Sequence, residues 1–153
     1  MPTTWSELGS YAHQSGRGPR RCHNRSMNLE IAPSGIAPTA ANYAHAVLSV
    51  GPSRLLHTSG IVPIAVDGSV PTDLAEQADT VWRNLLAILE QANMTVNDVV
   101  SITTYVVVGE PLAPVMAARD AALRGHRAAS TLVTVPALAR PEWRMEIALV
   151  AAR

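Results

Sequence analysis

The sequence predicts one α+β domain in which a mixed β-sheet carries two helices on one face. Three observations lead to this prediction: a strongly periodic helical segment, a long run of β-branched residues, and short elements in the order ββ, α, β, α, ββ. The length of 153 residues suits a single unit, and 48% hydrophobic with 16% charged residues is an ordinary globular composition. We place the domain at residues 27–153.

Residues 1–26 differ from the rest of the chain. They contain four arginines, one acid (Glu7) and no periodic apolar pattern. We interpret them as a disordered extension, or as sequence upstream of a true start at Met27. A basic RNA-binding arm and a transit peptide are the alternatives.

The clearest element is a helix that begins after Asp73. Apolar residues recur at spacings of three and four, which is the pattern of one helix face. These residues are Leu74, Ala78, Val81, Leu85, Ile88, Leu89 and Ala92. Asp73 and Glu76 have the spacing of a capping box, and Asn93 suits the C-cap. A second helix is predicted from Leu112 or Pro114 to about Leu123.

Several strands flank these helices. Ala44–Val50 and Arg54–Ser59 are predicted to form a hairpin around Gly51-Pro52-Ser53. Thr131–Val135 and Trp143–Ala151 are predicted as the last two strands.

The run Val99–Val108 is predicted to be a strand with two largely apolar faces. One face would hold Val100, Ile102, Val106 and Val108, and the other Val99, Tyr105 and Val107. Two helices cover only one face of a sheet, so we expect a partner subunit on the other.

The composition excludes several kinds of chemistry. The chain has no lysine, which rules out a lysine Schiff base, and Cys22 is its one cysteine, which rules out an intrachain disulfide or a cysteine zinc site. The histidines lack metal-site spacing, so neither a metal nor another cofactor is expected. Twelve basic residues balance twelve acidic ones, which gives no reason to expect a nucleic acid or membrane partner. No apolar run could span a bilayer and no secretory signal is evident, so we expect a cytoplasmic protein.

Four short segments, in order, resemble a known family. They are Tyr43-Ala-His45-Ala-Val47, Thr58-Ser59-Gly60-Ile61-Val62-Pro63, Asn97-Asp98-Val99-Val100 with Thr103-Thr104-Tyr105-Val106, and Ser130-Thr131-Leu132-Val133 with Met145-Glu146-Ile147. Each segment alone is weak evidence for the family. Together, over residues 36–153, they resemble the Rid (reactive intermediate deaminase, also YjgF) family.

This resemblance implies a chorismate-mutase-like fold and a homotrimer whose three clefts each draw residues from two chains. The family's clefts hold a small carboxylate-bearing imine or enamine. By position, Glu146 would handle the water or the proton. Tyr43, Ser59, Gly60 and Thr131 would bind the ligand, together with Ser130 beside them.

The chain departs from the family at the arginine that clamps the ligand carboxylate. Ala129 fills that position, or Ser130 if the register shifts by one residue. Met116 stands where deaminating members have an asparagine. A hydroxyl cannot replace the two-pronged hydrogen bonding of a guanidinium, so Arg127 or Arg144 would have to supply the clamp.

Simpler structural roles compete with these assignments. Glu146 could be an edge residue paired with Arg144, Tyr43 could be strand packing, and Ser59-Gly60 could be only a turn. A catalytic dyad of His45 or His57 with Ser59 lacks an orienting third group.

Two functions follow from the sequence, and a third is remote. The first is hydrolysis of a reactive imine or enamine, or of a related small C–N substrate, with Glu146 directing water. The second is a ligand-binding or regulatory trimer without turnover. An endoribonuclease-like activity is the remote alternative, because no aromatic and basic stripe is present.

Overall fold

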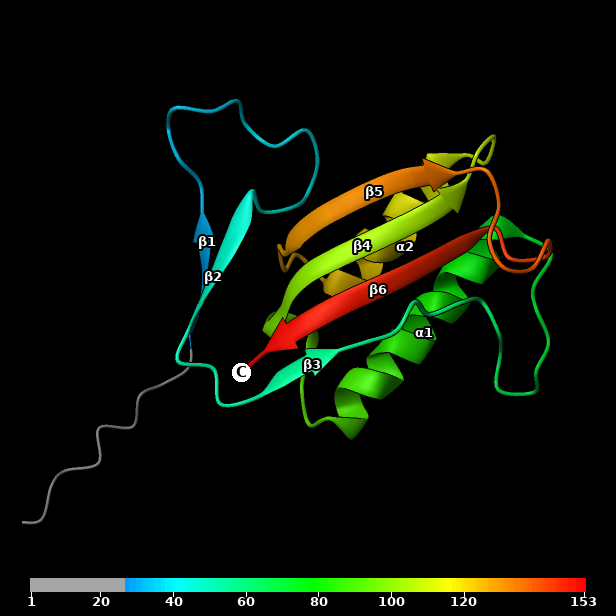
Figure 1. Cartoon of the computed structure of the whole chain (residues 1–153), viewed down its shortest axis with the longest axis horizontal. Helices are drawn as coiled ribbons and strands as arrows, with labels where there is room; N and C mark the ends of the chain where they lie inside the picture. Colours follow the sequence, from blue (N-terminus) through cyan, green and yellow to red (C-terminus); the bar gives the residue numbers. More distant parts are fainter. Residues whose placement is uncertain (1–26) are drawn as a thin grey trace, which may run out of the picture.

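A computed structural model describes residues 27–153, and the predictions for residues 1–26 lie outside the described part. The elements are β1 (Met27–Ile31), β2 (Ala46–Val50), β3 (Leu55–His57), α1 (Leu74–Gln91), the 3-10 turn η1 (Val96–Asp98), β4 (Val99–Val107), α2 (Leu112–Leu123), β5 (Ala129–Val135) and β6 (Met145–Ala152) (Figure 1). The predicted order is confirmed, with one strand, β1, added in front.

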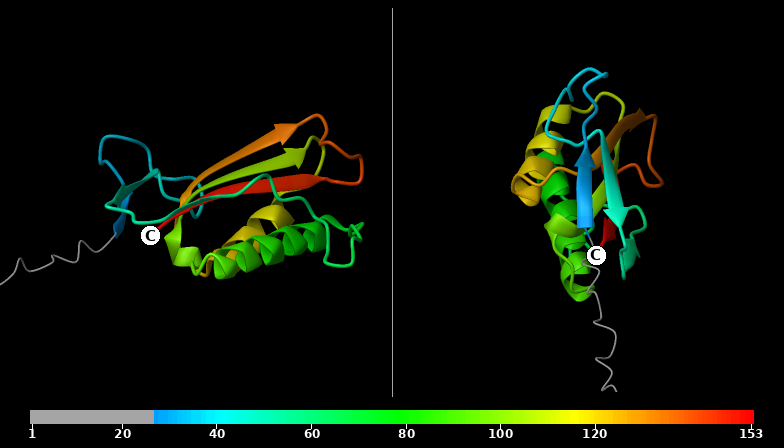
Figure 2. Two further views of the ribbon diagram at one scale, coloured as in Figure 1. Left: turned by 60° about the horizontal axis from the view of Figure 1, so that its bottom comes forward. Right: turned by 90° about the vertical axis from the view of Figure 1, so that its left-hand side faces the viewer.

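The main sheet has four strands in the order β3-β6-β4-β5. β4 runs parallel to β5 and antiparallel to β6, so the sheet is mixed. Both helices pack against the same face of this sheet, as the left view of Figure 2 shows. The predicted α+β class is therefore confirmed.

The hydrophobic core lies between this sheet and α1. Ile102 and Val106 of β4 and Ile147 of β6 are buried against the helices, and Leu85 and Leu89 of α1 meet them. These residues follow the two periodicities expected from the sequence, alternate positions on strands and every third or fourth position on the helix. That match between local pattern and packing explains why the elements form where predicted.

The ends of α1 follow the prediction only in part. Asp73 is the N-cap, and its side chain accepts a hydrogen bond from the N–H of Ala75. Glu76 makes no reciprocal bond among the described residues, so the capping box is wrong. Ala92, and not the predicted Asn93, is the C-cap. Asn93 is the next residue and has a φ of 53°.

The predicted hairpin between the second and third strands is wrong. β2 pairs with β1, whereas β3 pairs with β6 through Leu55 opposite Ala152. Gly51, with a φ of 59°, turns the chain after β2, and the N–H groups of Ser53 and Arg54 both donate to the carbonyl of Arg153 at 2.8 Å. β3 therefore pairs with the C-terminal strand β6, although the local turn signal had predicted that it would pair with β2.

The predicted faces of β4 need a correction. A register shift between Val99 and Ser101 places Val99 in the helix-facing core, where it is fully buried. Val108 lies beyond the strand and is 61% exposed. Thr104 is buried with Ile102, so a threonine occupies a core position that the apolar pattern had overlooked.

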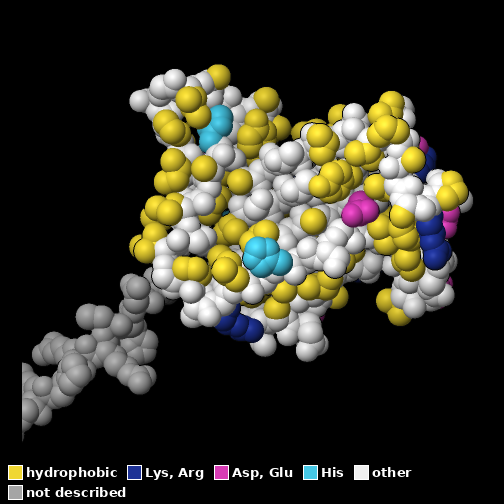
Figure 3. Space-filling model, viewed as in Figure 1, with side chains coloured by type: hydrophobic (Ala, Val, Ile, Leu, Met, Phe, Trp, Pro, Cys, Tyr) yellow, Lys and Arg dark blue, Asp and Glu magenta, His cyan; other side chains and the backbone are white. Residues whose placement is uncertain are grey.

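The side of the main sheet opposite the helices is here called the open face. The strand registers place on it Ser101, Thr103, Tyr105 and Val107 of β4, Ala129, Thr131, Val133 and Val135 of β5, and Glu146, Ala148 and Val150 of β6. Figure 3 views this face and shows mainly hydrophobic and uncharged side chains over the sheet, with basic side chains at its margins. The open face is more polar than predicted, but no described helix covers it.

Candidate functional site

Glu146 and Gly60 touch at the edge of the open face. A Cβ built on Gly60 would lie 1.6 Å from Oε1 of Glu146 and 2.4 Å from its Cδ. The carboxyl group therefore occupies the space that any other residue at position 60 would fill. Close approach, and not a positive φ, explains the glycine here.

The edge segment that carries Gly60 has an irregular register against β6. Thr58 donates its N–H to the carbonyl of Leu149 at 3.0 Å. Ile61 and Ile147 each donate an N–H to the carbonyl of the other. Two residues, Ser59 and Gly60, thus lie opposite the single residue between Leu149 and Ile147. The N–H groups of Ser59 and Gly60 have no hydrogen-bond partner within residues 27–153. Both N–H groups are thus free donors in the segment that contacts Glu146.

Thr58 contributes to this irregularity through its side chain. Its hydroxyl oxygen accepts the N–H of Leu149 at 2.9 Å, in the place of a backbone carbonyl. The hydroxyl thereby maintains the connection to β6 while the backbone after Thr58 bulges away. Such bulges commonly re-aim groups at functional sites.

Tyr105 is a further member of this group that the sequence did not single out as a site residue. It lies directly opposite Glu146 across the antiparallel β4–β6 pair, on the same face. Directly opposed residues have Cβ atoms about 4.5–5.5 Å apart, so the two side chains start from neighbouring positions. Its position in a segment with family resemblance was the available signal. We call Ser59, Gly60, Tyr105 and Glu146 the Glu146 cluster.

A second group lies at the start of β5. Ala44 forms a parallel bridge to Ala129, and its N–H donates to the carbonyl of Ala128 at 2.9 Å. This contact places Tyr43 near the first residues of β5, the strand that carries Thr131. The Tyr43 ring meets His45 edge-on, with 6.4 Å between the ring centroids. We call Tyr43, Arg127, Ala129 and Thr131 the Tyr43 cluster.

One chain does not bring the two clusters together. Ala129 pairs with Ser101, which pairs with Val150, four residues along β6 from Glu146. Four residues span about 13 Å and two strand spacings about 10 Å, so Ala129 and Glu146 are on the order of 16 Å apart. The two clusters therefore do not form one compact site within a single chain.

Arg127 forms its contacts within the chain. Its guanidinium donates to the carbonyl of Tyr43 at 2.6 Å and to the hydroxyl of Thr39 at 3.1 Å, and it lies 2.9 Å from a carboxylate oxygen of Glu30. The arginine thus ties the loop before β2 and the strand β1 to the base of β5. Its charge is balanced by Glu30.

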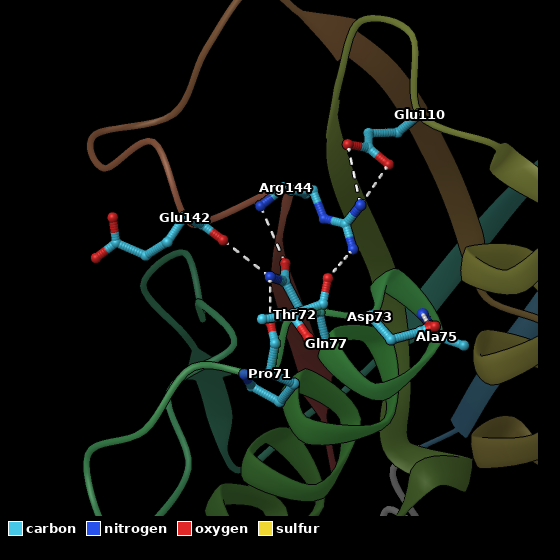
Figure 4. A network of polar contacts seen from close by, with 8 residues as sticks. All are labelled: Pro71, Thr72, Asp73, Ala75, Gln77, Glu110, Glu142 and Arg144. Atoms are coloured by element: carbon cyan, nitrogen blue, oxygen red, sulfur yellow. Dashed lines mark hydrogen bonds and ion pairs between the residues drawn. The ribbon is translucent and has the colours of Figure 1, made fainter.

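Arg144 is also engaged, in the network of Figure 4. Its guanidinium pairs with Glu110 at 3.1 Å and donates to the carbonyl of Thr72. Its N–H donates to Oε1 of buried Gln77 at 3.0 Å. The alternative in which Glu146 pairs with Arg144 is therefore wrong, because Arg144 pairs with Glu110.

Gln77 organises the same network from α1. Its amide nitrogen donates to the carbonyl of Pro71 at 2.7 Å and to the carbonyl of Glu142 at 2.8 Å. Because Gln77 is only 1% exposed, all three of its hydrogen bonds are formed away from water. They fix the chain entering β6, two residues before Glu146.

The remaining predicted residues lie elsewhere. Ser130 pairs with buried Ile102 and so faces the helices, whereas Ala129 and Thr131 face the open side. Met116 is half-buried in α2, in the helix layer. Within one chain, neither Ser130 nor Met116 joins the Glu146 cluster.

Fold and site thus define a class: a small α+β domain whose candidate site residues fall into two groups that lie apart in one chain. The family described as Endoribonuclease L-PSP matches residues 34–153. The 2-iminobutanoate/2-iminopropanoate deaminase of Escherichia coli (strain K12) is 31% identical over 134 residues, 85% of this chain and 98% of that protein. A RutC family protein of Haemophilus influenzae is 35% identical over 81 residues, and the match spans 52% of this chain and 57% of that protein.

Solved structures agree with these matches. A Rid family protein of unknown function from Yersinia pestis, YyfB, has a TM-score of 0.75 and 34% identity, covering 82% of this chain and 98% of its own. The YjgF gene product of E. coli has a TM-score of 0.61 and 29% identity, covering 82% and 98%. The E. coli protein TdcF with bound serine has a TM-score of 0.61 and 25% identity, covering 80% and 93%. The chain belongs to the Rid (YjgF) family. None of its described helices is long and apolar enough to cross a membrane.

Proposed function

We propose that the chain forms a homotrimer in which the Glu146 cluster of one subunit faces the Tyr43 cluster of the next, and that it hydrolyses a small imine or enamine in this cleft. The observation that carries the proposal is the contact between Glu146 and Gly60. In support, the carboxylate contacts a segment whose Ser59 and Gly60 N–H groups have no partner among the described residues, on an otherwise uncharged face. The separation of the two clusters in one chain supports a cleft built from two subunits.

Each group has a chemical task in this reaction. Hydrolysis of an imine adds the oxygen of water to the C=N carbon, breaks the C–N bond and releases ammonia with a carbonyl product. Glu146 accepts a proton from the attacking water and passes it to the departing nitrogen, as a general base and then a general acid. The N–H groups of Ser59 and Gly60 bind an oxygen of the substrate, and Tyr43 and Thr131 bound the opposite side.

Two relatives support a small C–N substrate. The E. coli relative is named for deamination of 2-iminobutanoate and 2-iminopropanoate, and it aligns over nearly its whole length. The TdcF structure contains bound serine, a molecule of similar size. At 31% and 25% identity, these names indicate the substrate class and leave its identity open.

Binding without turnover is the second candidate, and a specific observation favours it. Ala129 provides no cation on the open face, and both nearby arginines are paired with acids, Arg127 with Glu30 and Arg144 with Glu110. A carboxylate-bearing imine would therefore have no guanidinium with which to form a bidentate pair. An RNA-directed activity, suggested only by the family's description, has no basic surface on the open face to support it.

A subunit-mixing experiment tests the two-chain cleft and the chemistry together. Glu146→Gln and Tyr43→Ala should each lose most ammonia release from imines generated in solution. Random mixed trimers of the two variants should regain about one quarter of the wild-type sites, because each intact site needs Glu146 from one chain and Tyr43 from its neighbour. Recovery no higher than either variant alone would contradict the shared cleft. Absence of imine turnover by the wild type, with ligand binding retained, would leave the binding function.

A further inference from the structure

The charges around the proposed cleft point to the class of its ligand. In the Glu146 cluster, Glu146 is the one ionisable acid or base besides the Tyr105 phenol, and Ser59 and Gly60 add only neutral donors. No ion pair to Glu146 is formed among the described residues. This half of the cleft therefore contributes a carboxylate with no compensating cation.

The Tyr43 cluster does not supply the missing cation. Arg127 lies 2.9 Å from Glu30, and its guanidinium also binds the Tyr43 carbonyl and the Thr39 hydroxyl. Its charge is compensated, and two of its nitrogens are occupied.

Arg144 is likewise withdrawn from the open face. Although it precedes Glu146 by two residues, it pairs with Glu110 and donates to the Thr72 carbonyl near the start of α1. Figure 4 shows its guanidinium directed toward these two groups. When Arg127 is counted together with its partner Glu30, the net charge of the two clusters is that of Glu146 alone.

We infer that the ligand of this cleft is uncharged or cationic at the group next to the reacting carbon: a carboxamide-bearing or simple amine-derived imine, and not a carboxylate-bearing one. This inference rests on the proposed function, because it assumes that the two clusters meet. A carboxamide fits the donors and acceptors present. Its NH₂ donates to the Glu146 carboxylate, and its carbonyl oxygen accepts from the N–H groups of Ser59 and Gly60. A carboxylate would place two negative groups together with no cation between them.

The reaction differs from the family's only in the neighbouring group. Water adds to the C=N carbon of 2-iminopropanamide, the C–N bond breaks, and pyruvamide and ammonia leave. No oxidant, reductant or cofactor is needed. Pyruvamide and pyruvate, the products of the neutral and anionic imines, are nearly isosteric and differ mainly in charge.

Matched ligands test the inference. We expect calorimetry at pH 7 to show pyruvamide binding at least about tenfold more tightly than pyruvate, the order expected for one like charge at short range near a surface. Low salt should widen the difference, because screening is weaker there. Glu146→Gln, which keeps the shape and removes the charge, should bring the two affinities to within about threefold of each other by relieving the repulsion.

Turnover separates this inference from the proposed function. The imines of alaninamide and alanine, generated by an amine-oxidising reaction, provide the neutral and anionic substrates, and ammonia release is measured. Preference for the neutral imine supports both ideas. Tighter binding of pyruvamide without turnover supports the charge inference and rejects the enzyme. Equal or faster turnover of the anionic imine, or equal or tighter binding of pyruvate, overturns the inference and keeps the enzyme. Binding of neither ligand overturns both.

Discussion

The Glu146 carboxylate lies in the space that a Cβ of Gly60 would occupy. Such a Cβ would be only 1.6 Å from Oε1 of Glu146. The obstructing atoms belong to the far end of a flexible side chain, and Gly60 does not have a positive φ. An alanine at position 60 can therefore be accommodated if the carboxyl group moves. The two residues are coupled through space, although 86 positions (146 − 60) separate them in the sequence.

We expect Gly60→Ala to displace Glu146 while changing the free energy of unfolding by less than about 1 kcal/mol, because the backbone conformation suits alanine. The affinity for pyruvamide and the rate of imine turnover should fall nearly as far as in Glu146→Ala. The double variant should be no worse than Glu146→Ala alone, a non-additivity that denaturant unfolding together with calorimetry can measure. Full additivity of the two losses would show that Gly60 acts independently of Glu146.

Assembly should depend on the open face. Val133 lies on it and is 42% exposed, whereas Leu86, on α1, is 36% exposed. Light scattering of the wild type should give three times the 16.3 kDa chain mass. Val133→Arg should produce monomers, because an unpaired charge would be buried between subunits. Leu86→Arg, the matched control, should remain trimeric; a trimer that survives Val133→Arg places the interface elsewhere.

The vacant arginine position can now be assigned to one residue. Ala129 faces the open side, so Ala129→Arg should raise kcat/KM for a carboxylate-bearing imine by roughly one to two powers of ten, the scale of one partly screened charge-assisted pair. Ser130→Arg should lower stability by about 1–3 kcal/mol without that gain, since Ser130 is half-buried and faces the helices. Ammonia release and thermal unfolding report the two effects.

Adding Glu146→Gln to the Ala129→Arg variant provides the control. Binding without proton handling does not turn over, so the gain should disappear while affinity for the carboxylate remains. Retention of the faster rate would assign the proton transfer to a group other than Glu146.

Arg127 should hold the loop that carries Tyr43. Arg127→Ala should cost about 1–2 kcal/mol of unfolding free energy, because it removes charge-assisted bonds to the Tyr43 carbonyl and Thr39. Glu30→Gln should cost less than about 1 kcal/mol, since both partners of that ion pair are about one third exposed. Urea unfolding measures both. An equal loss in the two variants would mean that the ion pair, and not the backbone contact, anchors the loop.

Gln77 should be costly to replace, because its three side-chain hydrogen bonds are buried. Gln77→Leu keeps the volume but leaves the N–H of Arg144 and the carbonyls of Pro71 and Glu142 without this partner, at a total of about 3 kcal/mol. Gln91→Leu, at the exposed end of α1, should change stability by less than about 0.5 kcal/mol. Chemical denaturation of both variants checks the difference; similar values would mean that water replaces the buried bonds.

The sequence by itself determined both helices, every strand except β1, and the family. The apolar spacing from Leu74 to Leu89 is the helix face that packs on the sheet, and the β-branched run after Val99 is its central strand. The segments around Tyr43, Ser59-Gly60 and Glu146 were enough to indicate the Rid family. These features are readable because a helix or strand expresses its buried face as a local periodicity, and because family motifs are themselves local.

Only the tertiary structure decided the contacts between distant segments. It paired β3 with β6 instead of β2, placed Ala129 rather than Ser130 on the open face, and put the Glu146 carboxylate against Gly60. It also matched Arg127 with Glu30 and Arg144 with Glu110. The physical reason is that strand partners, bulges and ion pairs are chosen by competition among groups far apart in the chain. A local pattern therefore does not record which of them meet.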